Sequence, residues 1–312
     1  MMMKDLKTTI RNVEIRNPLI LASGILGSTY STLNKSFHEG FGAVTTKSIG
    51  IQPREGNPNP SVLYLPEINS IINAVGLANP GCSKFSEELQ YIDPNVKFII
   101  SVFGSSPDEL VSVIDCFREV RMQTKPIAFE LNLSCPHAKK VGMAVGTDPE
   151  VVEEVVKKVK TTFNIPIWVK LTPNISDITK IGEAAVSAGA DALVAINTLK
   201  ALLIDIEAKK PILGNIRGGL SGKAIKPIGL RAIYDLFESF GSEISLIGLG
   251  GISKWEDAVE YFLAGASAVQ IGSALHSYSS PEVFITELLN GLDSYLTREN
   301  LTLKELRGMA HG

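Results

Sequence analysis

The sequence predicts an α/β protein folded as a (β/α)8 barrel, the TIM barrel, and three observations support this fold class. Eight short apolar runs alternate with amphipathic helical stretches along almost the whole chain of 312 residues. Most of these runs are rich in Val, Ile and Leu without polar alternation, as in parallel strands buried on both faces. No G-x-G-x-x-G sequence follows the first run, which disfavours an open, doubly wound sheet. We therefore expect residues 1–312 to form one barrel domain with long loops over the carboxyl-terminal mouth.

The apolar runs are the predicted strands, and the segments between them have the ends of helices. The strands are expected at residues 18–22, 43–47, 98–103, 127–133, 167–171, 192–197, 244–248 and 268–272. Asp148 and Pro149 have the residue types of an N-cap and a first helical position, so a helix should begin there. The helical stretches at 176–189 and 254–265 both end in glycine after the last apolar residue, which is typical of a helix C-terminus.

Two segments are too long to be simple connections between a strand and a helix. Residues 50–80 are rich in Pro, Asn and Gly, so we expect a hairpin or an ordered flap over the barrel mouth. Residues 199–227 are also rich in glycine, and we expect a second long, mobile loop on the same face.

Composition excludes several classes of function. The net charge of −3 gives no reason to expect nucleic acid or an anionic membrane surface as a partner, so the substrate should be a small molecule. Cys82, Cys116 and Cys135 lie far apart, which argues against a disulfide framework, a zinc site or an iron–sulfur cluster held by this chain alone. The histidine spacing gives no metal site. The first residues have no apolar signal region, and no run of 18 apolar residues follows, so we expect a cytoplasmic protein without a membrane segment.

The strand predicted at 127–133 ends in a polar loop that carries one thiol. Asn132 can donate and accept hydrogen bonds, and Cys135 can give up or accept a proton. The alternative is a small buried cysteine beside the turn at Pro136. His137 is either a base partner of this cysteine or a solvated loop residue. Because other strands also end in polar or glycine-rich groups, we interpret the loop as part of a site.

The other strand ends indicate what that site binds, because (β/α)8 enzymes have their chemistry at the carboxyl ends of the strands. Lys47 and Lys170 end otherwise apolar strands, so each should face an electron-rich ligand or pair with a carboxylate such as Glu130. Glycines after the last two strands would let backbone N–H groups approach a phosphate, although a Gly-Gly pair is also a common plain turn. Together these groups suit a flavin held by lysine and backbone. In chain order the strand-end groups are Ser23-Gly24, Lys47-Ser48, Ser101, Asn132 with Cys135, Lys170, Asn197-Thr198, Gly250-Gly251 and Gly272-Ser273.

At these residues the chain resembles the class 1 dihydroorotate dehydrogenases over nearly its full length. The most specific segments are Asn132-Leu-Ser-Cys-Pro136, Pro53-Arg-Glu-Gly-Asn-Pro58 and Asn73-Ala-Val-Gly-Leu-Ala-Asn-Pro80. Further similar segments are residues 17–24, 46–48, 169–174, 196–198, 219–222 and 250–251. The segment Gly146-Thr-Asp-Pro-Glu150 is more similar to the NAD-linked subclass 1B, in its catalytic subunit, than to the fumarate-linked subclass 1A.

The resemblance implies FMN-dependent oxidation of (S)-dihydroorotate to orotate in pyrimidine (UMP) biosynthesis. It implies that hydride passes to N5 of FMN while Cys135 takes the proton, and that a homodimeric core works with a separate electron-transfer subunit. The residues implied to bind substrate are Lys47, Asn73, Ala74, Val75, Gly76, Leu77, Asn132, Asn197 and Thr198. Those implied to bind FMN are Ser23, Lys47, Ser48, Ser101, Asn132, Lys170, Ile196, Gly222, Gly250, Gly251, Gly272 and Ser273. No metal is implied.

Two departures from the family pattern bear on this assignment: the first weakens one expected flavin contact, and the second keeps an alternative substrate open. Ser101 and His137 stand where members of the family often have Asn. A Cys-Pro-His sequence also resembles the pyrimidine half of dihydropyrimidine dehydrogenases, so reduction of uracil or thymine is a second hypothesis. A third is a flavin-binding barrel without turnover, which would have no use for Cys135. The electron acceptor, whether NAD through a partner, fumarate or a quinone, is open.

Overall fold

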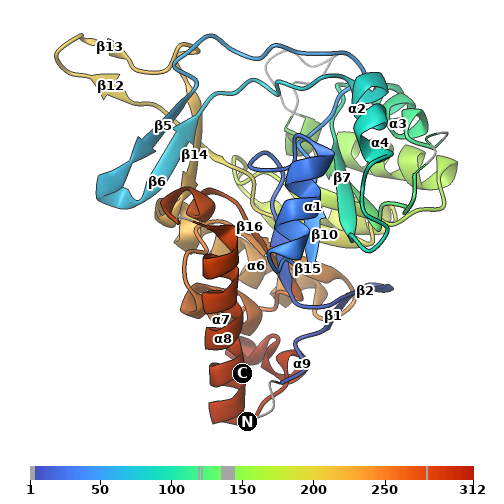
Figure 1. Cartoon of the computed structure of the whole chain (residues 1–312), viewed down its shortest axis with the longest axis vertical. Coiled ribbons are helices and arrows are strands. Elements are labelled where there is room, and N and C mark those ends of the chain that lie inside the picture. Colours follow the sequence, from blue (N-terminus) through green and yellow to red (C-terminus); the bar gives the residue numbers. More distant parts are fainter. Residues whose placement is uncertain (1–3, 119, 121, 135–144, 279) are drawn as a thin grey trace.

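The computed structural model describes residues 4–118, 120, 122–134, 145–278 and 280–312 of the chain. Eight parallel strands close into a barrel surrounded by helices (Figure 1), so the predicted (β/α)8 fold is confirmed. The strands pair in chain order, and the last pairs with the first. They are β3 (Leu19–Leu21), β4 (Ala43–Thr45), β7 (Phe98–Val102), β8 (Ala128–Asn132), β9 (Ile167–Leu171), β10 (Ala192–Ala195), β15 (Ser245–Leu249) and β16 (Ala268–Ile271).

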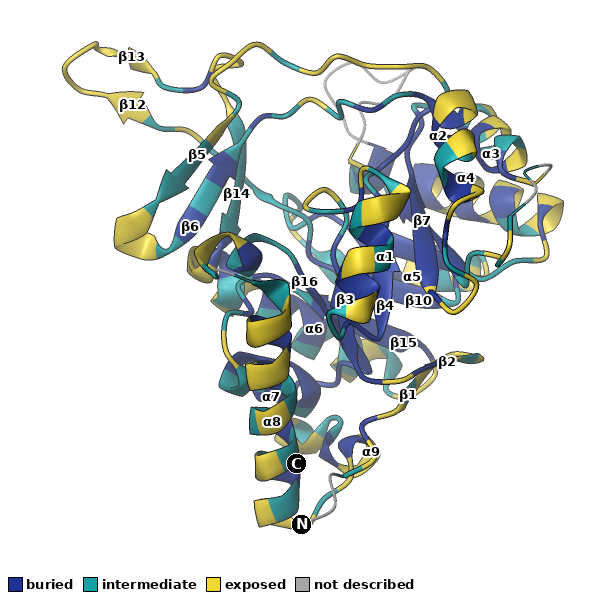
Figure 2. Ribbon diagram, in the orientation of Figure 1, coloured by how far each residue is buried: buried dark blue, intermediate teal, exposed yellow. Residues whose placement is uncertain are grey.

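The helices pack on the outside of the barrel, with apolar faces toward the strands and polar faces toward solvent (Figure 2). The α-helices are α1 (Tyr30–His38), α2 (Cys82–Leu89), α3 (Pro107–Cys116), α4 (Pro149–Thr162), α5 (Ile178–Ser187), α6 (Lys226–Phe240), α7 (Trp255–Leu263), α8 (Pro281–Glu299) and α9 (Leu303–Leu306). Short 3-10 turns are η1 (Pro66–Ile68), η2 (Val145–Thr147), η3 (Lys223–Ile225), η4 (Ser273–Ser277) and η5 (Met309–His311). In the part of the chain that the structure describes, none of the helices is both long and apolar enough to traverse a bilayer.

The helix ends confirm the local signals in the sequence. Asp148 is the N-cap of α4, and its side chain accepts a hydrogen bond from the backbone N–H of Glu150. The helices α5 and α7 are each followed by a glycine with positive φ, Gly189 at +97° and Gly265 at +113°. These capping residues thus mark where α4 begins and where α5 and α7 end.

The amino-terminal end of the barrel is closed by a small hairpin. Its strands are β1 (Thr8–Ile10) and β2 (Val13–Ile15), which pair antiparallel. Ile10 and Ile15 are fully buried and belong to the same apolar cluster as the residues inside the barrel, which include Trp168. The backbone N–H of Arg11 donates to Ser245 Oγ at 2.9 Å, at the first residue of β15. Packing at this end leaves the carboxyl-terminal end of the barrel for a site.

A four-stranded antiparallel sheet covers the carboxyl-terminal end of the barrel, in the order β11-β14-β6-β5. Its strands are β5 (Val62–Leu65), β6 (Ser70–Asn73), β11 (Leu199–Ala201) and β14 (Gly218–Gly222). The hairpin predicted within residues 50–80 is therefore confirmed as β5 and β6. We call this four-stranded unit the covering sheet.

The prediction of a long, mobile loop at residues 199–227 is wrong, because that segment supplies β11 and β14 to the covering sheet. The sequence of β14 lacks the alternation of apolar and polar residues that is typical of a strand. Its glycines instead allow neighbouring residues to pack closely against the backbone. A Cβ atom at Gly218 would lie 2.4 Å from the Asn73 carbonyl oxygen, and one at Gly219 would lie 2.2 Å from Thr198 Oγ1. The strand is specified by contacts with residues distant in sequence, which a local pattern does not reveal.

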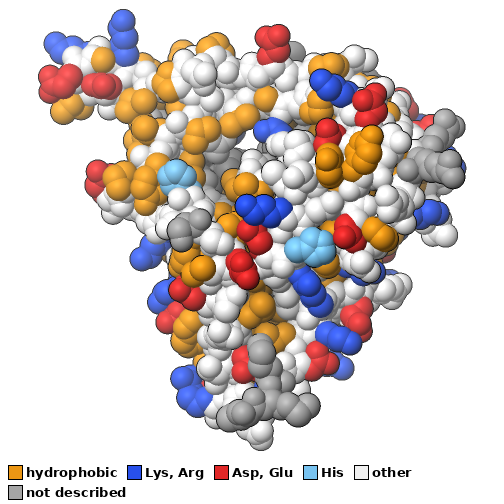
Figure 3. All heavy atoms as spheres, viewed as in Figure 1, with side chains coloured by type: hydrophobic (Ala, Val, Ile, Leu, Met, Phe, Trp, Pro, Cys, Tyr) orange, Lys and Arg blue, Asp and Glu red, His pale blue; other side chains and the backbone are white. Residues whose placement is uncertain are grey.

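Between β11 and β14 the chain projects from the molecule as a narrow arm (Figure 1). The arm contains the two-stranded pair β12 (Ile204–Asp205) and β13 (Lys210–Pro211). On the face in Figure 3, charged side chains of both signs gather at its tip beside apolar ones. Ile206, at the turn of the arm, is 80% exposed.

Candidate active site

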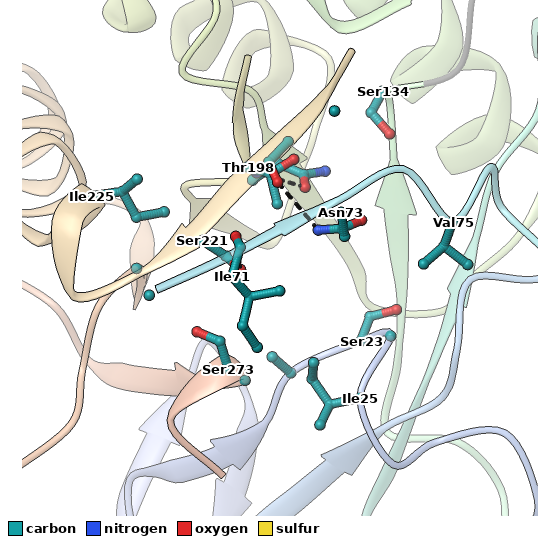
Figure 4. A pocket seen from close by; sticks show the side chains of 18 of the residues that line it. Ser23, Ile25, Ile71, Asn73, Val75, Ser134, Thr198, Ser221, Ile225 and Ser273 are labelled. Atoms are coloured by element: carbon teal, nitrogen blue, oxygen red, sulfur yellow. Dashed lines mark hydrogen bonds between the residues drawn. The ribbon is translucent and has the colours of Figure 1, made fainter. Parts of the chain in front are cut away.

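A pocket lies between the carboxyl ends of the barrel strands and the covering sheet. Its volume is about 860 Å3, within the range of pockets that bind small molecules and cofactors. Figure 4 shows Asn73 and Ser221 entering it from the covering sheet, while Ser23 and Ile25 come from the loop after β3. Strands distant in sequence thus converge on one cavity.

Most residues predicted for the site line this one pocket. Of those predicted to bind substrate, the lining includes Lys47, Asn73, Ala74, Val75, Gly76, Leu77, Asn132, Asn197 and Thr198. Of those predicted to bind the cofactor, it also includes Ser23, Ser48, Lys170, Ile196, Gly222, Gly250, Gly251, Gly272 and Ser273. Of the remaining two predicted residues, one lies outside the described part of the chain and the other does not line the pocket. Cys135 lies outside the described residues, which reach the pocket at Ser134. Ser101 is fully buried and does not line the cavity.

Ser101 lies beneath the pocket in a chain of hydrogen bonds between strand ends. The hydroxyls of Ser101 and Ser48 are 2.9 Å apart, and those of Ser48 and Ser23 are 3.2 Å apart. Asn132 Nδ2 donates to Ser48 Oγ at 3.0 Å, and Asn197 Nδ2 donates to Asn132 Oδ1 at 3.1 Å. Ser23, Ser48 and Asn197 follow β3, β4 and β10. Asn132 ends β8, and Ser101 is the last residue but one of β7. Because each side chain holds its neighbour, the floor of the pocket is fixed before any ligand binds.

A buried charged cluster lies beside this chain. The Lys170 ammonium is 3.5 Å from Glu130 Oε1, and both side chains are almost fully buried. Gln270 Nε2 donates to Glu130 Oε2 at 2.6 Å. Lys170 therefore pairs with Glu130, which is one of the two expectations for this lysine, and it also lines the pocket. Gln270 Oε1 is buried without a hydrogen-bond partner among the described residues, and Gln270 lines the pocket. A ligand N–H group would satisfy that oxygen.

Lys47 differs from Lys170 because no carboxylate of the described residues forms an ion pair with it. Partial burial lowers the pKa of Lys47, since desolvation disfavours its charged form. An anionic ligand in the pocket would offset that cost. The backbone at Lys47 is held by a hydrogen bond from its N–H to the Gly27 carbonyl oxygen at 2.8 Å.

The pocket is cationic although the chain carries a net charge of −3. The charged side chains that line it are Lys47, Lys170, Lys200 and Arg217. No Asp or Glu among the described residues belongs to the lining. Such a field favours negatively charged ligands. Sequence reasoning missed Lys200 and Arg217, because charged residues in a long connecting segment are usually only solvated.

Glycine loops form the part of the pocket near β15 and β16. Gly250 and Gly251 have φ of +130° and +68°, which favour glycine. A Cβ atom at Gly251 would lie 2.7 Å from Lys226 Cβ and 2.9 Å from the Gly222 carbonyl oxygen, so no larger residue fits there. The backbone N–H groups of Gly250 and Gly251 have no acceptor in the described part of the chain. Free N–H groups in a pocket can bind a phosphate-like anion.

Within the ranges that the structure describes, no group of three or more His, Cys, Asp or Glu side chains is arranged to hold a metal ion. The described lining offers amides, hydroxyls, backbone N–H groups, ammonium groups and one guanidinium.

Comparisons with known proteins give one family. The family model described as dihydroorotate dehydrogenase matches residues 5–296. The chain is 48% identical to the dihydroorotate dehydrogenase B (NAD(+)) catalytic subunit of Methanosarcina mazei, over 97% of this chain and 94% of that protein. It is 48% identical to the subunit of the same name from Pyrococcus abyssi, over 98% of this chain and 99% of that protein. For Methanocaldococcus jannaschii the identity is 46%, over 98% of each chain.

A solved structure has the same fold at low sequence identity. It is the crystal structure of DHODH from Eimeria tenella in complex with ferulenol. The TM-score is 0.83 and the identity 19%, with 98% of this chain and 89% of that chain covered. This likeness concerns the fold of the chain.

Proposed function

The chain belongs to the dihydroorotate dehydrogenase family, and on that premise we propose that it oxidises (S)-dihydroorotate to orotate in pyrimidine (UMP) biosynthesis. The observation that carries the proposal is the cationic pocket, which contains Lys47, Lys170, Lys200 and Arg217 without an acidic lining residue among the described ones. Both dihydroorotate and orotate carry a carboxylate, whereas uracil and thymine are neutral. The charge of the pocket therefore favours dihydroorotate over the neutral pyrimidines.

The described residues fit FMN as the cofactor. The glycine loops offer unpaired N–H groups to a phosphate, and the unpaired oxygen of Gln270 offers an acceptor to a ring N–H. We propose that the phosphate lies against Gly250, Gly251, Gly272 and Ser273, and that Lys170 lies by the ring. The other residues proposed to hold FMN are Ser23, Lys47, Ser48, Asn132, Ile196 and Gly222. When bound, FMN would accept a hydride from C6 of dihydroorotate at N5.

Ser101 then supports the cofactor indirectly. Its hydroxyl is 2.9 Å from that of Ser48, which lines the pocket while Ser101 does not. We propose that Ser101 orients Ser48 and does not itself touch FMN.

The substrate would lie between the cofactor and the covering sheet. Asn73 at the end of β6, and Asn132 and Asn197 at strand ends, supply amides suited to a pyrimidine ring. Lys47 supplies a positive charge for the carboxylate. Thr198 and the backbone of residues 74–77 complete the proposed substrate site. We propose that Cys135, as a thiolate, removes the proton from C5.

The relatives are named catalytic subunits, which supports a separate partner for this chain as well. We propose that residues 1–312 form one cytoplasmic domain, that two chains form a homodimeric core, and that an electron-transfer subunit passes electrons to NAD. The isolated chain should then reduce an artificial dye, but not NAD. Efficient NAD reduction by the chain alone would overturn this proposal, and fumarate-dependent turnover would indicate a stand-alone enzyme.

The activity itself is tested by the visible spectrum of the purified protein under anaerobic conditions. Dihydroorotate should bleach the bound flavin, whereas dihydrouracil at the same concentration should leave it oxidised. Bleaching by dihydrouracil instead would establish a dihydropyrimidine dehydrogenase activity. A bound flavin that neither compound reduces would mean a binding protein without turnover.

A further inference from the structure

Tyr261 of α7 fills a space that three glycines leave open. Tyr261 is fully buried. A Cβ atom at Gly229 of α6 would lie 2.2 Å from its hydroxyl oxygen, and one at Gly248 of β15 would lie 2.4 Å from its Cδ1. A Cβ atom at Gly250 would lie 3.4 Å from the hydroxyl oxygen. Glycines on a helix, a strand and a loop thus make room for one phenol.

The phenol hydroxyl holds the loop that follows β15. Tyr261 donates a hydrogen bond of 2.8 Å to the Gly250 carbonyl oxygen. Burial raises the pKa of Tyr261 well above its usual value, and the nearby charges of Asp257 and Glu260 raise it further. The hydroxyl therefore keeps its proton and remains a donor at physiological pH.

Holding this carbonyl also orients the next N–H group. The peptide bond between Gly250 and Gly251 is trans, and in a planar trans peptide the C=O and N–H bonds point in opposite directions. The Gly250 oxygen turns toward Tyr261 in the core, so the Gly251 N–H turns away from it. Gly251 lines the pocket, and its N–H has no acceptor in the described part of the chain.

Asp257, one turn earlier on α7, holds the other end of the same loop. Asp257 Oδ2 accepts hydrogen bonds from the backbone N–H groups of Ser253 at 2.9 Å and Lys254 at 3.1 Å. Its Oδ1 accepts from Lys226 Nζ at 2.7 Å. Asp257 and Tyr261 are four residues apart, so they project from the same face of α7. This face therefore fixes residues 250–254 at both ends.

We propose that Tyr261 is a positioning residue for phosphate recognition, because its hydroxyl fixes the Gly250–Gly251 peptide with the N–H toward the pocket. The inference rests on the proposed binding of FMN and deepens it. Tyr261 would then make the chain select a phosphorylated flavin over the same ring system without phosphate. A tyrosine that only fills the core would support both ligands equally.

The test compares FMN with riboflavin, which lacks the phosphate. Flavin would be removed from the full-length chain, and the dissociation constants of both flavins measured by fluorescence titration for the wild type and Tyr261→Phe. Phenylalanine keeps the ring in its space and removes one buried hydrogen bond. We expect FMN to bind about five- to tenfold more weakly and riboflavin to change by less than about twofold.

Tyr234→Phe is the matched control. Its hydroxyl also faces a carbonyl, that of Ala310 at 3.5 Å, but at the surface and away from the loop. This control should leave the ratio of the two dissociation constants unchanged. Equal weakening of FMN and riboflavin in Tyr261→Phe, or no change in either, would overturn the inference alone. A wild-type chain that binds neither flavin would overturn the proposed cofactor, and the inference with it.

Discussion

Glu130 and Lys170 lie on adjacent strands of the barrel, β8 and β9, with a carboxylate oxygen 3.5 Å from the ammonium nitrogen in a buried setting. Lys170 lines the proposed flavin site, whereas Glu130 does not. The carboxylate therefore compensates part of the charge that Lys170 presents to a ligand. This pairing gives the chain a means to set the reduction potential of a bound flavin.

Substitution of either partner should shift that potential, in opposite directions. Lys170→Ala removes positive charge near the ring, disfavours the negatively charged reduced flavin and lowers the midpoint potential or the flavin affinity. Glu130→Gln leaves Lys170 uncompensated and raises the potential, by roughly 30 mV for a ~1.4 kcal/mol effect on a two-electron couple. Spectroelectrochemical titration measures both shifts. Unchanged potential and affinity in Lys170→Ala would make Lys170 a structural ion-pair residue.

Cys135→Ala should remove general-base catalysis while flavin remains bound. The rate of flavin reduction by dihydroorotate should fall about 10²–10⁴-fold. In the wild type this rate should rise with pH as the thiolate forms. Stopped-flow measurement of flavin bleaching gives both quantities. Near-normal reduction in the variant would contradict the assignment of Cys135 as the base.

Titration of Lys47 should make kcat/KM fall at alkaline pH, which is opposite to the rise expected from Cys135. The pKa of Lys47 is lowered by burial, so the cation that binds the substrate carboxylate is lost as pH rises through a value below the usual 10.4 or so. Wild-type kcat/KM should therefore fall at high pH. In Lys47→Gln, kcat/KM should be about 10- to 100-fold lower and lack this fall, because no cation remains to titrate. A variant that keeps the same alkaline limb would assign the limb to another group.

Lys200 and Arg217 should attract the anionic substrate toward the pocket. In Lys200→Gln and Arg217→Gln, the second-order rate of flavin reduction by dihydroorotate should fall a few-fold at low salt. The difference should shrink as salt rises to about 1 M, where the screening length is near 3 Å. Lys180→Gln, an exposed lysine of α5 outside the lining, is the control. A loss that salt leaves intact would mean direct contact with the substrate.

The sequence was most informative where local chemistry decides the structure. The barrel strands are apolar runs, and the polar group that ends each run lies at the mouth because all eight strands are parallel. That geometry places Lys47, Asn132 and Lys170 in one pocket without any further information. The helix caps, such as Asp148, are equally local.

Residues whose role depends on distant contacts were missed. Gln270 interrupts the apolar strand β16, yet only the structure pairs it with Glu130. The glycines of β14 belong to a strand because Asn73 and Thr198 lie against them. In the sequence, Tyr261 resembles any other apolar residue of an amphipathic helix. Only the structure shows the three glycines that surround it.

The closed amino-terminal end of the barrel, where the hairpin of β1 and β2 packs, also determines the order in which bound molecules can dissociate. Ile10 and Ile15 pack against the apolar residues that fill the barrel, so a molecule bound at the strand ends can leave only toward the covering sheet. In the proposed arrangement the flavin lies against the strand ends and the pyrimidine lies over it, beneath the covering sheet. Saturating orotate should therefore trap the cofactor kinetically and slow the escape of flavin from the folded chain.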